Sequence, residues 1–239
     1  MDYDMLTERQ KGILSALIRE YVTTAQPVSS GELVKKYRLA YSPATVRNEI
    51  LELDREGFTL QPHTSAGRIP TDKGYRFFIG QNLPDEKAEK KIEKSFRPLR
   101  DIDDEFDFLR QTSRLLAHFS GEFSMAGFFG KGMLYKSGIA EAFNDPEFAD
   151  ETRMHEFGEL VDFLDEEFKN FFEPEDLEEP RVFIGAENPI REARNYTMIV
   201  SSSPTPFGEN GIFGILGPRR MDYNRNLSLL RAMQRLFSD

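Results

Sequence analysis

The sequence predicts an α+β protein in which a winged helix-turn-helix unit precedes a domain of mixed strands and helices. Three features of the 239-residue chain indicate this organisation. Capped helices with short connections fill the first quarter, and a polar loop bounded by prolines follows them. The last third alternates short apolar runs with one final helix, as expected for an α+β domain.

The first two predicted helices begin with the same capping signal. Thr7 and Gln10 form an S/T-x-x-E/Q capping box, and Ser29 and Glu32 repeat it. Each box precedes apolar residues at helical spacing. These are Ile13, Leu14, Leu17, Ile18, Tyr21 and Val22 in the first helix, and Leu33, Val34 and Tyr37 in the second. Both segments are therefore predicted to be amphipathic helices.

The third predicted helix starts at Ser42, a good N-cap, and Pro43, whose fixed φ suits the first helical position, and it ends near Gly57. Its apolar stripe consists of Val46, Ile50 and Leu53. The opposite face of its first two turns carries Ala44, Thr45, Arg47 and Asn48. A helix-turn-helix needs such a polar, exposed end to enter a major groove.

The side chains at this helix end can make the contacts by which proteins read DNA. Arg47 can bind guanine O6 and N7 or a phosphate, and Asn48 can pair with adenine N6 and N7. Thr45 can contact a thymine methyl or a phosphate. Capping residues and amphipathicity predict a helix but not its function, so the alternative interpretation is that these are ordinary solvent-facing residues on a surface helix.

The segment after Gly57 predicts a β-hairpin. Residues 58–60 alternate like a strand, and residues 62–70 form a polar tip and a return strand. A plain hairpin that closes a small domain is one interpretation. Directly behind a helix-turn-helix, we interpret it as a wing whose tip lies along the DNA backbone or in a minor groove. The predicted DNA-binding residues are Ser42, Ala44, Thr45, Arg47, Asn48, His63, Thr64, Ser65, Arg68 and Lys73.

Five nearly gap-free runs carry a resemblance to a known family. Three lie near the N-terminus: LTERQKGILSALIREYV (residues 6–22), SPATVRNEILELDREGF (42–58) and QPHTSAGRIPTDKGYRFF (61–78). Two lie near the C-terminus: VFIGAENP (182–189) and GILGPRRMDYNRNLSLL (214–230). On these residues the chain resembles the HrcA family of heat-inducible transcription repressors.

The resemblance implies a dimeric repressor that binds an inverted-repeat operator in double-stranded DNA ahead of chaperone genes and depends on the GroE chaperonin. It also implies a winged helix followed by a GAF-like domain with an inserted dimerising domain. This chain is shorter than the usual family member, and much of the inserted domain is expected to be absent after residues 123–130. We therefore expect a reduced GAF-like domain, and a homodimer formed through the helix at residues 85–100 or through the C-terminal domain.

The expected domains are a winged-helix DNA-binding domain over residues 1–82, a linker helix over 83–104 and the reduced GAF-like domain over 105–239. The linker helix has a narrow apolar stripe of Ile92, Phe96 and Leu99. This stripe is consistent either with a coiled-coil-like partner face or with a core contact. Beyond it we expect helices at 105–120, 146–172 and 223–237, and strands at 123–130, 181–184, 197–201 and 211–216.

The charge of −10 is unevenly distributed. Residues 1–82 hold 11 Lys+Arg against 10 Asp+Glu, a net +1; residues 83–180 hold 12 against 26, a net −14; and residues 181–239 hold 8 against 5, a net +3. The DNA-reading end is thus near neutral and must rely on locally grouped cations. With no cysteine, no apolar run long enough to span a bilayer and no basic flank typical of a signal peptide, we expect a cytoplasmic protein without membrane contact.

The sequence disfavours an enzyme. Its histidines, His63, His118 and His155, are scattered, and it contains no P-loop, G-x-S-x-G or dinucleotide fingerprint. The acids between residues 166 and 179 lack the regular spacing of oxygen ligands, so we expect neither a metal site nor a cofactor. The alternative function is a chaperonin-docking or ligand-sensing regulatory protein with weakened DNA reading.

Overall fold

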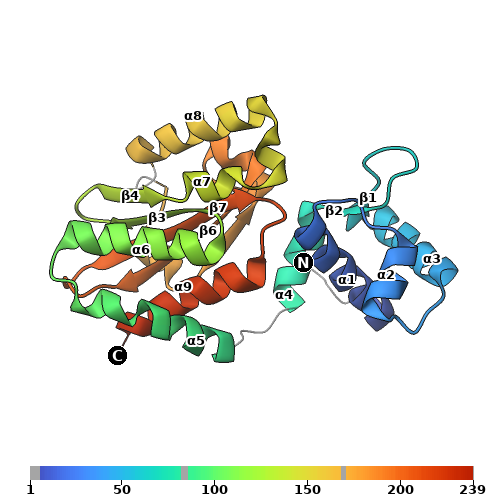
Figure 1. The fold of residues 1–239 in the computed structure, drawn as a ribbon, viewed down its shortest axis with the longest axis horizontal. Coiled ribbons are helices and arrows are strands. Elements are labelled where there is room, and N and C mark those ends of the chain that lie inside the picture. The colour runs from blue at the N-terminus through green and yellow to red at the C-terminus, as the bar shows by residue number, and fades with distance from the viewer. Residues whose placement is uncertain (1–5, 82–85, 168–170, 239) are drawn as a thin grey trace. The chain divides into compact units, whose positions relative to one another are not determined.

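The computed structural model describes residues 6–81, 86–167 and 171–238 (Figure 1). The chain divides into two compact units, an N-terminal unit of residues 1–83 and a C-terminal unit of residues 84–239. Together they contain helices and a five-stranded antiparallel sheet, which agrees with the predicted α+β class. Of the two expected domain boundaries, the one between residues 82 and 83 falls outside the described ranges, and both boundaries stay predictions.

The N-terminal unit is a cluster of helices with one two-stranded ladder. Its elements are α1 (Glu8–Thr24), α2 (Ser30–Tyr37), α3 (Pro43–Arg55), β1 (Thr59–Leu60), β2 (Ile69–Pro70) and α4 (Asp72–Gln81). Both predicted capping boxes are present, at Thr7 with Gln10 and at Ser29 with Glu32. The residues that fill the core include Leu14, Leu17, Leu33, Val46, Leu53 and Phe77.

The apolar face of α1 is shorter than predicted. Ile13, Leu14, Leu17 and Ile18 are buried as expected, but Tyr21 and Val22 are only half-buried. Both lie in the last turn of the helix, next to Thr23 and Thr24, which are exposed. The core of the unit therefore covers most, but not all, of the predicted stripe.

Helix α3 ends at a glycine turn, as the sequence predicts. Gly57 has φ +76°, a left-handed conformation that glycine adopts without steric cost. The amide of Phe58 donates to the Leu53 carbonyl at 2.9 Å, and that of Gly57 donates to the Asp54 carbonyl at 3.0 Å. This pair of hydrogen bonds is a Schellman motif, and it directs the chain into β1.

The C-terminal unit is built on an antiparallel sheet of strand order β4-β3-β7-β6-β5. The strands are β3 (Phe123–Phe128), β4 (Met133–Ser137), β5 (Arg181–Ile184), β6 (Tyr196–Pro204) and β7 (Asn210–Pro218). The helices are α5 (Glu86–Phe96), α6 (Glu105–Ser120), α7 (Ile139–Phe143), α8 (Glu151–Glu167) and α9 (Tyr223–Phe237). Short 3-10 turns complete it: η2 (Arg97–Asp101), η3 (Pro146–Ala149), η5 (Pro174–Leu177), η6 (Gly185–Glu187) and η7 (Arg191–Asn195).

Helices cover both faces of this sheet (Figure 1). Because side chains alternate along a strand, β3 sends Phe123 and Met125 to a core shared with Phe157 of α8. It sends Phe128 to the other face, where its ring stacks on Phe108 of α6 with centroids 6.4 Å apart. On that second face Thr197 of β6 is hydrogen-bonded to Tyr223 of α9.

Most predicted elements of this unit are found, with some corrected bounds. The structure has helices at 105–120 and 223–237 and strand 181–184 as predicted, whereas β6 and β7 are longer than expected. The helix predicted over 146–172 begins with η3, and α8 follows up to Glu167; residues 168–170 lie outside the described part. Strand β4 and helix α7 were not predicted. Every residue of β4 is half-buried, so this edge strand lacks the alternation by which a strand is recognised.

Helix α5, over which a linker helix is predicted, packs against α9. Phe96 and Leu99 are buried, and Ile92 is half-buried. Arg100 donates through Nε to the Leu236 carbonyl at 2.8 Å, and Arg235 lies 2.9 Å from the buried Glu89 carboxylate. Of the two interpretations of the apolar stripe, the structure shows the core contact.

Asn188, in the VFIGAENP run, braces the connection between β5 and β6. It is 1% exposed, and its Nδ2 lies 3.0–3.1 Å from the carbonyl oxygens of Gly185, Ala193 and Tyr196 and 3.3 Å from that of Phe183, so these four acceptors share its two N–H groups. Buried carbonyls without a donor are costly. A structural requirement therefore accounts for an asparagine in this motif.

No described helix is long and apolar enough to cross a membrane. Among the residues that the structure describes, no group of three or more His, Asp or Glu side chains is arranged to hold a metal ion.

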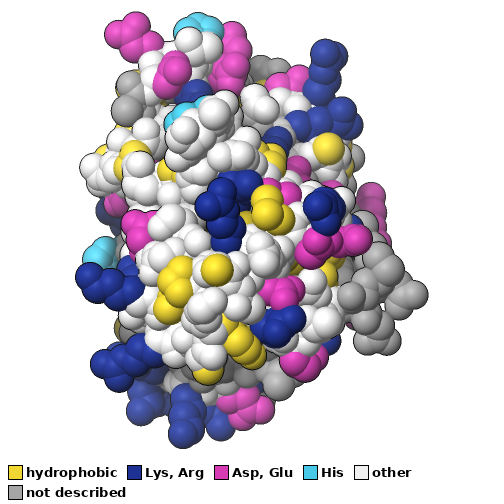
Figure 2. Space-filling model, turned by 90° about the vertical axis from the view of Figure 1, so that its right-hand side faces the viewer, with side chains coloured by type: hydrophobic (Ala, Val, Ile, Leu, Met, Phe, Trp, Pro, Cys, Tyr) yellow, Lys and Arg dark blue, Asp and Glu magenta, His cyan; other side chains and the backbone are white. Residues whose placement is uncertain are grey.

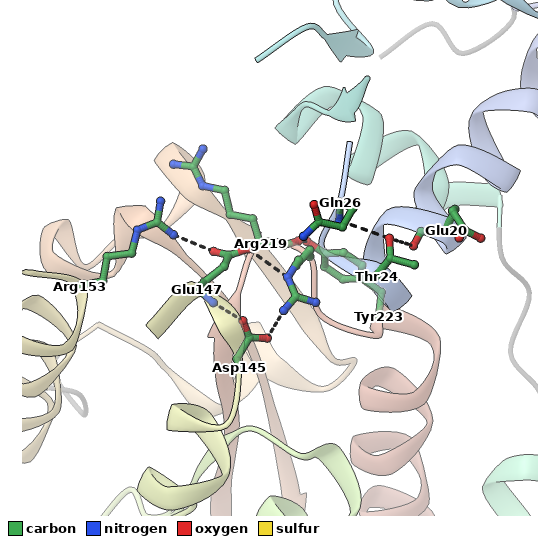
Figure 3. A network of polar contacts seen from close by, with 9 residues as sticks. Glu20, Thr24, Gln26, Asp145, Glu147, Arg153, Arg219 and Tyr223 are labelled. Carbon is green, nitrogen blue, oxygen red and sulfur yellow. Dashed lines mark hydrogen bonds and ion pairs between the residues drawn. The ribbon is translucent and has the colours of Figure 1, made fainter. Parts of the chain in front are cut away.

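An ionic cluster around the buried Arg220 joins η3 to the segment after β7 (Figure 3). Arg220 pairs with Asp145 at 2.5 Å and Glu147 at 3.2 Å, and Glu147 also binds Arg153 at 3.0 Å.

Glu122 is 7% exposed, and its burial, followed by the charge of Asp145, raises its pKa from 4.5 to about 8. Its carboxyl group therefore holds a proton in the folded protein at neutral pH.

This burial predicts a pH-dependent stability. Below about pH 4.5 Glu122 is protonated in both states, and between 4.5 and about 8 the folded state keeps a proton that the unfolded state has released. The free energy of unfolding therefore falls as the pH rises through this window. We expect Glu122→Gln to raise the thermal midpoint by several degrees more at pH 8 than at pH 5, measured by circular dichroism.

Glu192→Gln, at an exposed position, is the matched control, and it should leave the thermal midpoint unchanged at both pH 5 and pH 8. The stability of Glu122→Gln should still fall somewhat as the pH rises, because burial also raises the pKa of Glu147. If Glu122→Gln and the wild-type protein lose stability in parallel between these pH values, the assignment to Glu122 is wrong.

Candidate nucleic-acid interface

The N-terminal end of α3 is fixed by its cap. The Ser42 hydroxyl accepts the Thr45 amide at 3.1 Å, and the two hydroxyl groups are hydrogen-bonded at 2.9 Å. Pro43 occupies the first helical turn. Thr45 is half-buried and its hydroxyl is already used within the cap, so its methyl group is the part left for an outside contact.

Beyond this cap, α3 presents a polar surface. Ala44, Arg47 and Asn48 are exposed, while Val46, Ile50 and Leu53 are buried beneath them, as predicted. Within the described ranges, the side chains of Arg47 and Asn48 make no hydrogen bond or ion pair. Their donor groups are therefore available to a ligand.

The loop between β1 and β2 is held to the segment before α2. Val28 and Arg68 exchange two backbone hydrogen bonds of 2.9 and 2.8 Å. Gly67, next to Arg68, lies so close to the backbone of Val28 that an added Cβ would be 2.5 Å from the Val28 carbonyl carbon and oxygen. Only glycine fits this position without moving the backbone.

A second contact ties the loop to α3. Asp54 accepts Arg68 Nε at one carboxylate oxygen and the Thr59 hydroxyl at the other, both at 2.5 Å. The side chains of Arg68 and Asp54 are only 17% and 21% exposed. This partly buried, charge-assisted pair fixes the angle between the loop and the helix.

The loop tip remains open to solvent. His63, Thr64 and Ser65 are exposed, and Ser65 has a left-handed φ of 72°. The turn is closed by the Ala66 amide, which donates to the His63 carbonyl at 3.0 Å, and by Gln61 Nε2, which donates to the Ala66 carbonyl at 3.0 Å. The tip therefore has a defined shape of its own.

The loop and α3 together form a groove of about 330 Å³. Arg47, Ile50 and Leu51 line it from the helix, and Ser65 to Arg68 line it from the loop. The structure thus brings predicted site residues from two separate segments to one concavity.

Two predicted cations are engaged inside the unit. Arg68 turns toward Asp54, and Lys73 donates to the Glu56 carbonyl at 2.6 Å with its ammonium 4.2 Å from the Phe58 ring centroid. Lys73 thereby neutralises the C-terminal end of α3. Over most of the face in Figure 2, Lys and Arg side chains lie singly among uncharged and acidic ones, and several gather at its lower edge.

Asp54, Gln61 and Gly67 belong to this site but are not among the residues predicted from the sequence. Asp54 is an acid near the end of an amphipathic helix, and its partner lies 14 residues further along the chain. Only Gly67, between an alanine and an arginine in a loop, gave a local signal of a special backbone position.

Comparison with known proteins identifies the family. The family described as HrcA protein C terminal domain matches residues 78–227, which is more than half of the chain. The chain belongs to the HrcA family. This HrcA chain is 46% identical over 116 residues to the heat-inducible transcription repressor HrcA of Kineococcus radiotolerans. It is 60% identical over 78 residues to the protein of the same name from Chloroflexus aggregans.

These matches cover only part of the relatives. The first spans 47% of this HrcA chain and 33% of the Kineococcus protein, and the second spans 33% and 20%. A solved structure described only as that of a hypothetical protein has a TM-score of 0.74, covers 97% of this chain and 98% of its own, and is 17% identical. This likeness shows the fold of the HrcA chain.

The close approach at Gly67 predicts the effect of adding one methyl group. Gly67→Ala should lower the free energy of unfolding by about 1–3 kcal/mol, because the Cβ collides with backbone that cannot rotate away. Urea unfolding followed by circular dichroism measures it.

Gly12→Ala is the matched control. Gly12 lies in α1 with nothing within 4 Å of an added Cβ, and the change should stabilise the protein by up to about 1 kcal/mol. Equal stability of Gly67→Ala and the wild-type protein would contradict the anchoring of the loop to Val28.

Proposed function

We propose that this protein represses transcription of heat-shock genes by binding an inverted-repeat operator in double-stranded DNA. The observation that carries the proposal is the groove in which Arg47 of α3 and the tip of the following loop meet. Membership of the HrcA family, whose curated relatives are named heat-inducible transcription repressors, supports it.

In this proposal residues 1–82 are a winged helix-turn-helix. Helix α3 enters the major groove with its capped end first, so that Arg47 reaches guanine or phosphate, Asn48 reaches adenine and the Thr45 methyl meets a thymine. Ser42 and Ala44 border this contact at the start of the helix. The exposed tip of His63, Thr64 and Ser65 lies against the flanking backbone.

We propose different roles for the three predicted cationic site residues. Arg47 has no partner within the described residues and is free to contact DNA. Arg68 is occupied by Asp54, and Lys73 by the Glu56 carbonyl. We therefore propose that Arg68 and Lys73 position the loop and α3 rather than grip phosphate.

Repression would follow from occupancy. Two copies of the recognition helix, one from each protomer of a homodimer, would occupy successive major grooves and exclude polymerase from the promoter. The C-terminal unit would be the reduced GAF-like domain that supplies the dimer surface. Because Phe96 and Leu99 are buried within their own chain, we favour the exposed face of this unit over α5 as that surface.

A GroE-type chaperonin is proposed as a further partner, and the cytoplasm as the site of action, from the family resemblance.

Removing the charge of Arg47 tests the proposed DNA contact. Arg47→Met should weaken binding to the inverted repeat by about tenfold or more, since a bidentate base contact is worth about 1–3 kcal/mol. Fluorescence anisotropy with the inverted repeat, a half-site and a scrambled duplex measures this loss.

The matched control is Arg55→Met, at the other end of α3, where Arg55 pairs with Glu52. This variant should bind like the wild-type protein. Indistinguishable operator affinities for Arg47→Met and Arg55→Met would overturn the assignment of the helix face.

The salt dependence of binding distinguishes a positioning arginine from a phosphate contact. Each phosphate contact contributes about 0.9 to the slope of log K against log salt concentration for duplex DNA. Arg68→Met should weaken operator binding but leave this slope unchanged, and Asp54→Asn should have the same effect because it breaks the same pair. A slope that falls by about one in Arg68→Met alone would show that Arg68 binds phosphate.

A further inference from the structure

The C-terminal unit contains a second groove, separate from the DNA-binding residues. It has a volume of about 630 Å³ and lies between η5 with the residues after it, the end of β6 and the last turns of α9. The sheet register explains why it exists. Strand β5 begins at Arg181, which pairs with Val200, so β6 continues for four residues beyond its neighbour. No described strand covers this side of residues 201–204, and the groove runs along it.

Gln234 of α9 holds the walls of this groove together. Its Nε2 donates to the Glu178 carbonyl at 2.7 Å and the Ser202 carbonyl at 2.9 Å, and lies 3.5 Å from the Leu177 carbonyl. One side chain thus links α9, β6 and the segment after η5. The groove is therefore already shaped in the free protein, as binding sites for small molecules usually are.

The two walls carry opposite charges. Glu175, Glu178 and Glu179 are exposed on one wall, and α9 contributes Arg231 and Arg235 to the other. Arg235 is paired with Glu89 of α5. Arg231 is half-buried, and within the described part of the chain its guanidinium has no hydrogen bond or ion pair.

The floor supplies further polar groups. Ser202 is 7% exposed and gives its carbonyl to Gln234, while its hydroxyl makes no hydrogen bond to any residue that the structure describes. Asn210 is exposed at the same end of the groove. A half-buried arginine, a buried hydroxyl and a facing row of carboxylates are complementary to a ligand that carries both charges.

We propose that this groove binds a free α-amino acid. The ligand carboxylate pairs with the Arg231 guanidinium, which is suited to planar, two-pronged recognition of carboxylates. The ammonium group faces Glu178 and Glu179, and the Ser202 hydroxyl supplies a neutral hydrogen bond. The ligand bridges α9 and the segment after η5, so its binding stabilises the C-terminal unit. This site requires nothing of the DNA-reading residues.

Thermal unfolding and calorimetric titration of the full chain with a panel of proteinogenic L-amino acids test the site. At millimolar concentration, at least one amino acid should raise the unfolding midpoint in a saturable way and titrate to one site per chain. Propionate and ethylammonium, which carry one charge each, should not compete with it. A panel in which no amino acid binds, or in which a singly charged analogue binds equally well, overturns the proposal.

Variants of both walls locate the site. Arg231→Met should weaken binding by about tenfold or more, equivalent to about 1.4 kcal/mol. The double variant Glu178→Gln with Glu179→Gln should also weaken it, through loss of the ammonium partner rather than the carboxylate partner. Arg191→Met, at an exposed position of η7 outside the groove, is the control and should bind like the wild-type protein. Unchanged affinity in Arg231→Met would place the ligand elsewhere.

Discussion

The Asp54 carboxylate is the contact on which the candidate DNA surface depends. It lies in the last turn of α3 and binds both Thr59 of β1 and Arg68 at the base of the loop, each at 2.5 Å. Two short strands of two residues each could not hold a hairpin in place by themselves. The ion pair, together with the backbone bonds between Val28 and Arg68, makes helix and loop one surface. The tip residues can then have a constant position relative to Arg47.

In the C-terminal unit, the groove beside β6 depends on the unequal lengths of β5 and β6. The sheet buries one face against α8 and the other against α6 and α9, so both of its faces are core. Only its edges are left for other uses. Where β6 extends beyond β5, the Gln234 side chain donates a hydrogen bond to the Ser202 carbonyl, and a groove lined by charged residues lies beside this contact. Asn188 has the corresponding structural role at the other end of β5.

Local signals in the sequence predicted the elements well. The caps at Thr7, Ser29 and Ser42 and the apolar runs of the sheet involve residues within a few positions of each other. Strand β4 was missed because it is a half-buried edge strand that its pairing with β3 defines. The role of Arg68 could not be predicted either. An arginine in a loop looks the same whether it faces a phosphate or Asp54, and only the tertiary fold brings that acid within reach.

Hydroxyl-radical footprinting of the inverted-repeat operator, combined with methylation protection of guanine N7, tests the central claim most directly. If α3 and the loop form one rigid surface in a dimer, guanines should be protected in two major grooves about one helical turn, or a multiple of it, apart. Each should be flanked by protected backbone where the loop tip lies, and Asp54→Asn should lose the flanking protection first. Backbone protection without any protected guanine, or a single protected groove, would contradict the account.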